Sequence, residues 1–183
     1  VLLALDIEYE TYQASVRPIS FLLTPATVCL AIPLYRQLSL LKKYPLAIIG
    51  GVLSGVLTAM VSIYLLSLFF GLTHEQYVSI LPKSITTAIG MGVSEKMGGV
   101  VPLTVISISI SGISGTILAD IWLKLLRIRE PMAKGLALGT AAHALGAAKA
   151  MEQGEIEGAM SSLSIVVTGI LSVVAISIFA PLI

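Results

Sequence analysis

The chain has 183 residues, of which 56% are hydrophobic and 11% are charged, and its formal net charge is +1. A soluble domain carries about 25% charged residues, so this composition excludes an ordinary soluble domain and indicates one compact membrane domain over residues 1–183. The small net charge and the lack of a basic stripe with interleaved aromatic residues exclude nucleic acid as a partner. The single cysteine, Cys29, cannot form a disulfide within the chain and is typical of a small buried residue.

Long apolar runs with few or no charged residues predict the membrane spans. A spanning helix needs about 20 apolar residues, and we expect such helices at Pro45–Phe70, Val100–Leu126 and Gly158–Ile183. The chain starts inside an apolar run without an initiator methionine, so we also expect a preceding N-terminal part that contains most of one span. Glu152–Glu157 reads as a solvated acidic loop.

Three further segments are apolar but interrupted, and they do not read as simple spans. Pro18–Tyr35 is broken by two prolines, Pro82–Gly99 carries charges and glycines, and Gly135–Ala150 is too short to cross a bilayer. Irregular backbone at membrane depth is tolerated only where it is buried or lines a cavity. We therefore predict broken helices here, although the first segment also fits an ordinary proline kink.

Two short echoes at an offset of 114 residues suggest an internal duplication. Leu53–Thr58 parallels Val167–Ser172, and Leu5–Ile7 parallels Ala119–Ile121. Each echo is weak by itself because small apolar residues match by chance. The shared offset predicts a first repeat over about residues 1–70 and a second over about residues 82–183.

Lysine and arginine residues predict the orientation of these repeats. Arg36–Lys43 and Lys124–Lys134 are both basic, and cytoplasmic loops carry an excess of such residues. If both lie inside, Pro82–Gly99 starts and ends outside as a re-entrant hairpin, and the repeats are inverted as in many secondary transporters. The alternative is a short full crossing with parallel repeats. We favour the inverted plan, an all-α polytopic membrane protein with discontinuous helices.

Hydroxyl, amine and imidazole groups gather at the three broken segments. A helix that begins at Pro82 would present free N–H groups and a positive partial charge, which favour an anion. The candidate substrate-binding residues are Thr24, Thr27, Lys83, Ser84, Thr86, Thr87, Thr140 and His143.

Two of these candidates carry a charge or titrate. His143 can donate to a carboxylate or carry a proton coupled to transport, but it also fits a packing histidine with satisfied hydrogen bonds. Lys83 can add a positive charge, or it can extend along the membrane interface. The acidic residues at 152–157 with one nearby histidine form no zinc pattern. Without a nucleophile motif, P-loop or dinucleotide fingerprint, we expect no enzyme, no metal and no cofactor.

Several motifs resemble the LrgB/CidB family of bacterial membrane proteins. The resemblance covers nearly the whole chain, and it departs from the family pattern at Ala88, where a proline often follows the paired threonines. The motifs are Phe21–Val28, Pro33–Tyr35, Leu81–Thr87, Ser94–Gly99, Leu125–Pro131, Lys134–Gly146 and Glu155–Leu163.

The resemblance implies two functions. A plastid relative is similar to a glycolate/glycerate translocator, and related bacterial systems are associated with pyruvate uptake. From this and the broken segments we expect a secondary transporter of small monocarboxylates in the bacterial cytoplasmic membrane. The alternative is an antiholin-like regulator of murein hydrolases and autolysis. The expected partners are the lipid bilayer, a small carboxylate, a small LrgA/CidA-type membrane protein and further copies of the chain.

Overall fold

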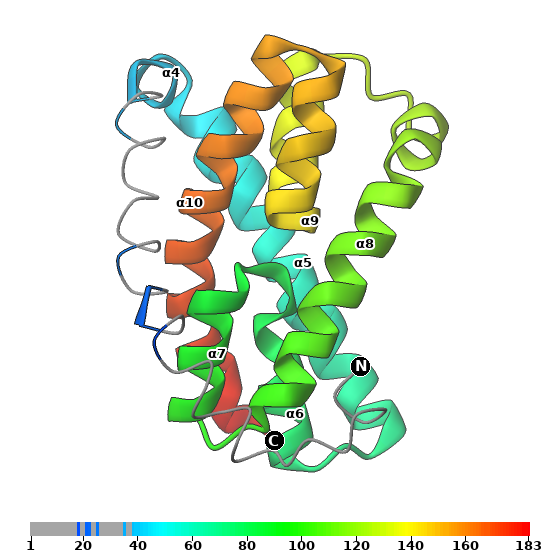
Figure 1. The fold of residues 1–183 in the computed structure, drawn as a ribbon. Coiled ribbons are helices and arrows are strands. Elements are labelled where there is room, and N and C mark those ends of the chain that lie inside the picture. The colour runs from blue at the N-terminus through cyan, green and yellow to red at the C-terminus, as the bar shows by residue number, and fades with distance from the viewer. Residues whose placement is uncertain (1–17, 19–20, 23–24, 26–34, 36–37) are drawn as a thin grey trace, which may run out of the picture.

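The computed structural model describes residues 18, 21, 22, 25, 35 and 38–183. This part of the chain is helical and contains no strand, which confirms the predicted all-α class (Figure 1). The elements are α4 (Leu38–Lys43), α5 (Pro45–Phe70), α6 (His74–Ile80), the 3-10 helix η2 (Leu81–Ser84), α7 (Thr87–Lys96), α8 (Val101–Leu125), α9 (Pro131–Gln153), α10 (Glu155–Phe179) and the 3-10 helix η3 (Ala180–Leu182).

Among the described residues, three helices, α5, α8 and α10, are long and apolar enough to cross a membrane, as predicted. The bounds of α5 match the predicted run, and those of α8 differ from it by one residue at each end. Pro45 lies in the first turn of α5, where backbone N–H groups have no partner within the helix, so the N–H that proline lacks costs no hydrogen bond. Gly71 ends the helix with a left-handed φ of 62°, a conformation that suits glycine.

The predicted acidic loop at 152–157 is wrong, because α10 begins at Glu155 and only Gly154 separates it from α9. Glu157 is buried and belongs to the first turn of α10. Carboxylates are favoured there because the N-terminal end of a helix carries a positive partial charge. Glu155 and Glu157 therefore start a helix, and Glu152 lies in the last turn of α9, so these residues form no loop.

α9 is a hairpin of two half-helices. His143 interrupts it with φ 48° and ψ −126°, far from helical values. In a straight helix Gly146 would lie about 12 Å from Leu138, but it packs directly against the Leu138 carbonyl group. Leu138 and Ala150 also share one core cluster. The chain therefore reverses at His143, and Figure 1 shows both halves on the same side of this turn.

Residues 74–96 form a second hairpin, built from α6, η2 and α7. At its base, the Ser79 hydroxyl accepts a hydrogen bond of 2.7 Å from the backbone N–H of Val100, which leads into α8. The Thr104 hydroxyl of α8 donates to Ser94 near the end of α7, at 2.7 Å. Both arms of the hairpin therefore meet the start of α8. The predicted bounds Pro82–Gly99 are wrong, because α6 precedes Pro82 and forms one arm, so that Pro82 lies between the two arms. The arrangement of the arms favours a re-entrant hairpin over a full crossing.

The break in this second hairpin differs from the predicted one. Pro82 lies within η2, a single 3-10 turn that begins at Leu81, and the longer helix α7 begins at Thr87. Ile85 and Thr86 lie between them in extended backbone conformations. A 3-10 turn is tighter than an α-helix and is rarely extended, so the helix start moves five residues along the chain.

The two hairpins enter the bundle from opposite ends. Gln153, at the end of α9, donates to Asp120 near the end of α8. The α6–α7 hairpin instead contacts the start of α8 and the end of α10, where Tyr77 donates to the Phe179 carbonyl at 2.9 Å. Because α8 runs the length of the bundle, the hairpins approach each other from its two ends (Figure 1).

The described parts of the two basic segments lie at one end of the molecule. Leu40 and Leu41 of α4 and Met132 of α9 pack against the same core cluster, around Met160. This places Lys42 and Lys43 at the end where α8 leads into α9, as expected if both segments face the cytoplasm. Much of the N-terminal half of the predicted first repeat, including Thr24, Thr27 and Cys29, lies outside the described residues, so the inverted repeat stays a prediction.

Candidate functional site

The tips of the two hairpins touch in the interior of the bundle. The Nε2 atom of His143 lies 3.0 Å from the backbone carbonyl oxygen of Lys83, and the His143 side chain is 5% exposed. A carbonyl oxygen only accepts, so Nε2 carries the proton in this contact. The other ring nitrogen, Nδ1, is buried without a hydrogen-bond partner among the described residues. The contact therefore leaves Nδ1 available to a further group.

A half-helix begins at each of the two tips. α7 starts at Thr87, directly after the extended Thr86, and the second half of α9 starts after His143. The first N–H groups of a helix have no partner within the helix, and its N-terminus carries a positive partial charge. Thr86 does not cap α7 with its side chain, and its hydroxyl oxygen is buried without a partner. The region around the two hairpin tips therefore offers backbone N–H groups and the Thr86 hydroxyl as hydrogen-bond donors, which suits a negatively charged group.

A cavity of about 1040 Å³ opens beside the hairpin tips. Its walls are α5 and α8, and its floor is formed by the first half of α9 together with Lys83 and Ser84 of η2. Ser84 is buried, and its hydroxyl oxygen accepts a hydrogen bond of 3.1 Å from the Lys83 amine. The lysine side chain is thus held at the cavity.

Hydroxyl groups line both walls of this cavity. On α5, Ser54, Thr58 and Ser62 follow one another at intervals of four residues and so share one helix face. On α8, Ser111 and Ser114 face the cavity. The three α5 hydroxyls donate to carbonyl groups of their own helix at 2.6–2.8 Å, which leaves their oxygen atoms free to accept. The cavity therefore combines apolar walls with a limited set of polar contacts, which is typical of small-molecule sites.

Thr140 connects the cavity to the helix packing around it. A Cβ added at Gly55 of α5 would lie 2.9 Å from the Thr140 methyl group, so α9 and α5 are closely packed there. On its other side, the Thr140 hydroxyl accepts from Thr168 of α10 at 3.4 Å. Thr140 thus contacts two helices, α5 and α10, from the first half of α9.

The structure brings together part of the predicted site. Lys83, Ser84 and Thr140 line the cavity, and His143 contacts Lys83 at its edge. Thr86 and Thr87 lie at the start of α7. Ligand binding by these residues stays a prediction, and Thr24 and Thr27 lie outside the described residues.

Sequence reasoning missed the hydroxyls of α5 and α8. The four-residue spacing of Ser54, Thr58 and Ser62 was a usable signal, because it marks one face of an otherwise apolar span. Thr168 and Trp122 carried no such signal. Thr168 matters through its contact with Thr140, and Trp122 lines the cavity from α8.

These features define a class of protein. The chain is a helical membrane protein in which two hairpins from opposite ends meet beside a cavity between long apolar helices. The chain belongs to the LrgB-like family, whose model matches residues 1–182. Members of this family are not typical enzymes.

Curated relatives support this assignment. The chain is 42% identical over 182 residues to the uncharacterized protein YxaC of Bacillus subtilis (strain 168), covering 100% of this chain and 77% of that protein. It is 41% identical to the antiholin-like protein LrgB of Bacillus mycoides (strain KBAB4) and 39% identical to that of Bacillus cereus (strain B4264). Each of these matches covers 96% of this chain and 76% of the relative. No solved structure matches significantly.

Proposed function

We propose that this chain is an antiholin-like protein that restrains lysis from within the bacterial cytoplasmic membrane. The observation that carries the proposal is its identity of about 40% with relatives named antiholin-like over nearly all of the chain. Three apolar helices support insertion as a multi-pass protein. The proposal includes a small LrgA/CidA-type membrane partner and control of murein hydrolases.

Detergent-induced lysis of cells tests this proposal. A strain that lacks its own members of the family would express either the chain or an empty vector, and the decline of optical density would be followed. We expect slower lysis with the chain, and a further delay when the small membrane partner is co-expressed. An unchanged lysis rate in both backgrounds, with the protein present in the membrane, would overturn the proposal.

The site geometry supports a second candidate, the transport of a small monocarboxylate such as pyruvate, glycolate or glycerate. The supporting observation is the contact of the two hairpin tips beside the cavity, with a half-helix that begins at each tip and Lys83 at the cavity floor. Discontinuous helices that point their N-termini at anionic groups are a recurring device of secondary transporters. The names of the relatives favour the antiholin-like function over this one.

In this second candidate each group has a distinct role. The free N–H groups at the start of α7 and of the second half of α9 would bind the carboxylate. The Lys83 amine would add a full positive charge. The unpartnered Nδ1 of His143 would accept a hydrogen bond from the hydroxyl of glycolate or glycerate, or take up a coupled proton. The hydroxyl rows of α5 and α8 would contact the rest of the molecule.

Uptake of labelled carboxylates into proteoliposomes tests transport. Thr140→Val removes a hydroxyl at the cavity, and Thr116→Val is the matched control because Thr116 bonds its own helix at Gly112 and lies outside the cavity. We expect uptake by the wild-type chain, a loss of at least fivefold with Thr140→Val, and near-normal uptake with Thr116→Val. Absence of uptake by correctly inserted wild-type protein would reject this candidate while leaving the antiholin-like proposal intact.

A further inference from the structure

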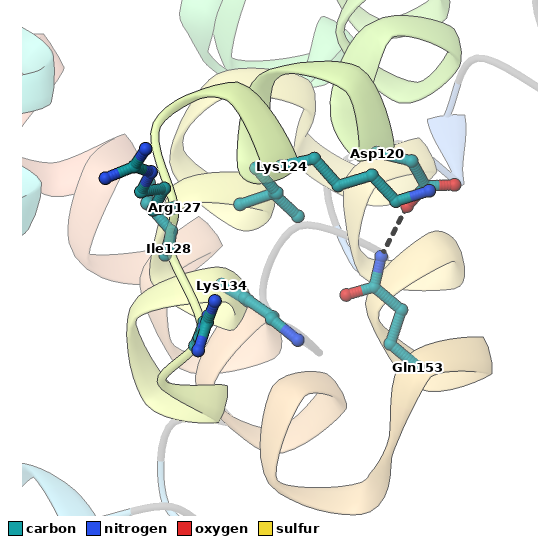
Figure 2. Close-up of a pocket in the computed structure, with 8 residues that line it drawn as sticks. Asp120, Lys124, Arg127, Ile128, Lys134 and Gln153 are labelled. Atoms are coloured by element: carbon teal, nitrogen blue, oxygen red, sulfur yellow. Dashed lines mark hydrogen bonds between the residues drawn. The ribbon is translucent and has the colours of Figure 1, made fainter.

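A basic pocket lies at the end of the bundle where α8 leads into α9. It has a volume of about 590 Å³. It is built from the last turns of α8, the connection that follows, and both outer ends of the α9 hairpin (Figure 2). Its lining residues are Asp120, Leu123, Lys124, Arg127, Ile128, Arg129, Lys134 and Gln153.

The charge of this pocket is strongly unbalanced. Four lining side chains are cationic and one is a carboxylate. The carboxylate, Asp120, is already engaged: it lies 3.3 Å from the Lys149 amine and accepts a hydrogen bond of 3.0 Å from Gln153. Asp120 also raises the pKa of Lys149, by hydrogen bonding and by its charge. The ion pairs among the described residues include none of the four lining cations.

Helix electrostatics account for only part of this arrangement. Lys124 stands in the last turn of α8, where the negative end of the helix favours a cation. Lys134 stands in the first turn of α9, where the positive end disfavours one. The excess of basic residues in cytoplasmic loops explains why this region is basic. It does not explain why basic side chains from two helix ends and the loop between them line the same pocket.

The loop geometry holds Arg127 at the rim of the pocket. Arg127 has a left-handed φ of 55°, and Ile128 donates to the Leu123 carbonyl at 2.9 Å, which closes the end of α8. Glycine is the usual residue at such a position, because a side chain in this conformation is strained. Figure 2 shows Arg127 on the side of the pocket away from Asp120 and Gln153, with Lys134 between them.

We propose that this pocket binds a phosphate group, carried either by an anionic lipid headgroup or by a small soluble molecule. Guanidinium groups form paired hydrogen bonds with phosphate oxygens, and a lysine amine adds a compact charge. A phosphate held by Arg129 and Lys134 would join the connection after α8 to the base of the α9 hairpin. Binding would therefore stabilise the hairpin whose tip carries His143.

Thermal unfolding of the purified full chain in neutral detergent tests the proposal. The probes are phosphatidylglycerol, phosphatidylcholine and inorganic pyrophosphate, each titrated at constant ionic strength. Arg129→Gln/Lys134→Gln removes two charges from the pocket. Lys42→Gln/Lys43→Gln is the matched control, because it removes two exposed charges from the same end of the molecule but outside the pocket.

We expect a saturable rise in unfolding temperature with a phosphate probe, since a ligand stabilises the state that it binds. The half-saturating concentration should rise about tenfold or more in the pocket variant and stay nearly unchanged in the control. An effect of phosphatidylglycerol alone would identify the headgroup as the source, and an effect of pyrophosphate alone the soluble molecule. No shift with phosphatidylglycerol or with pyrophosphate, or an equal loss in both variants, would overturn the proposal.

Discussion

The turn at His143 makes a sharp prediction about backbone strain. Its φ of 48° and ψ of −126° are values that glycine adopts without penalty and other residues adopt at a cost of about 1–3 kcal/mol. His143→Ala and His143→Gly both remove the imidazole and its hydrogen bond to Lys83. The difference between the two variants therefore isolates the backbone conformation.

The strain and the greater flexibility of unfolded glycine oppose each other. Glycine costs roughly 0.5–1 kcal/mol relative to alanine through the entropy of the unfolded chain. Subtraction leaves His143→Gly more stable than His143→Ala by about 1 kcal/mol, or about 2–4 °C in unfolding temperature for a chain of this size.

Thermal unfolding in detergent would measure this difference, with Ala148→Gly as the matched control. Ala148 is exposed in the helical part of the same hairpin, so glycine should lower the unfolding temperature there. The opposite signs at the two positions are the expected signature. If His143→Gly were less stable than His143→Ala, the turn at His143 would be refuted.

Two further predictions concern packing and a buried hydrogen bond. A Cβ added at Gly139 would overlap Ser164 and the Ser161 carbonyl, so Gly139→Ala should destabilise the protein by about 1–3 kcal/mol in the thermal unfolding assay. Gly92→Ala is the control: a Cβ there meets nothing within 4 Å, so this variant should be neutral or slightly stabilising. Tyr77→Phe should lower stability by roughly 1 kcal/mol, because it leaves the Phe179 carbonyl without its 2.9 Å partner; equal stability to wild type would contradict the placement of α6 against α10.

The long helices were predictable because their signal is local. Pro45–Phe70 is uncharged throughout and begins with proline, so composition alone delimits α5. Gly135–Ala150 was recognised as too short to span, but its reversal at His143 carries no sequence signal. Histidine is not a usual turn residue, and the contact of its side chain with Lys83 in the other hairpin lies 60 residues away in the sequence.

The candidate site depended on long-range packing that sequence reasoning does not supply. Lys83 and His143 are 60 residues apart and meet only because two hairpins enter from opposite ends. Glu157 was misplaced for a related reason: a run of acidic residues reads as solvated loop, although here it starts a helix that packs against Gly135. Local charge predicts exposure well only where no neighbouring helix covers the residue.

The most direct test of this fold asks from which side of the membrane each hairpin arm can be labelled. The fold requires the two hairpins to enter from opposite sides and to meet at His143 and Lys83. Single cysteines would be introduced into a Cys29→Ser background and labelled in intact cells with a membrane-impermeant maleimide. One pair is Glu75→Cys with Glu95→Cys, and the other is Ala133→Cys with Glu152→Cys. All four positions are exposed.

We expect the first pair to be labelled from outside and the second pair only after the membrane is permeabilised. Both members of a pair should behave alike, because the two arms of a hairpin return to the same side. Labelling of Glu75→Cys and Glu95→Cys from opposite sides would show that this segment crosses the membrane, and would contradict the meeting of two re-entrant hairpins.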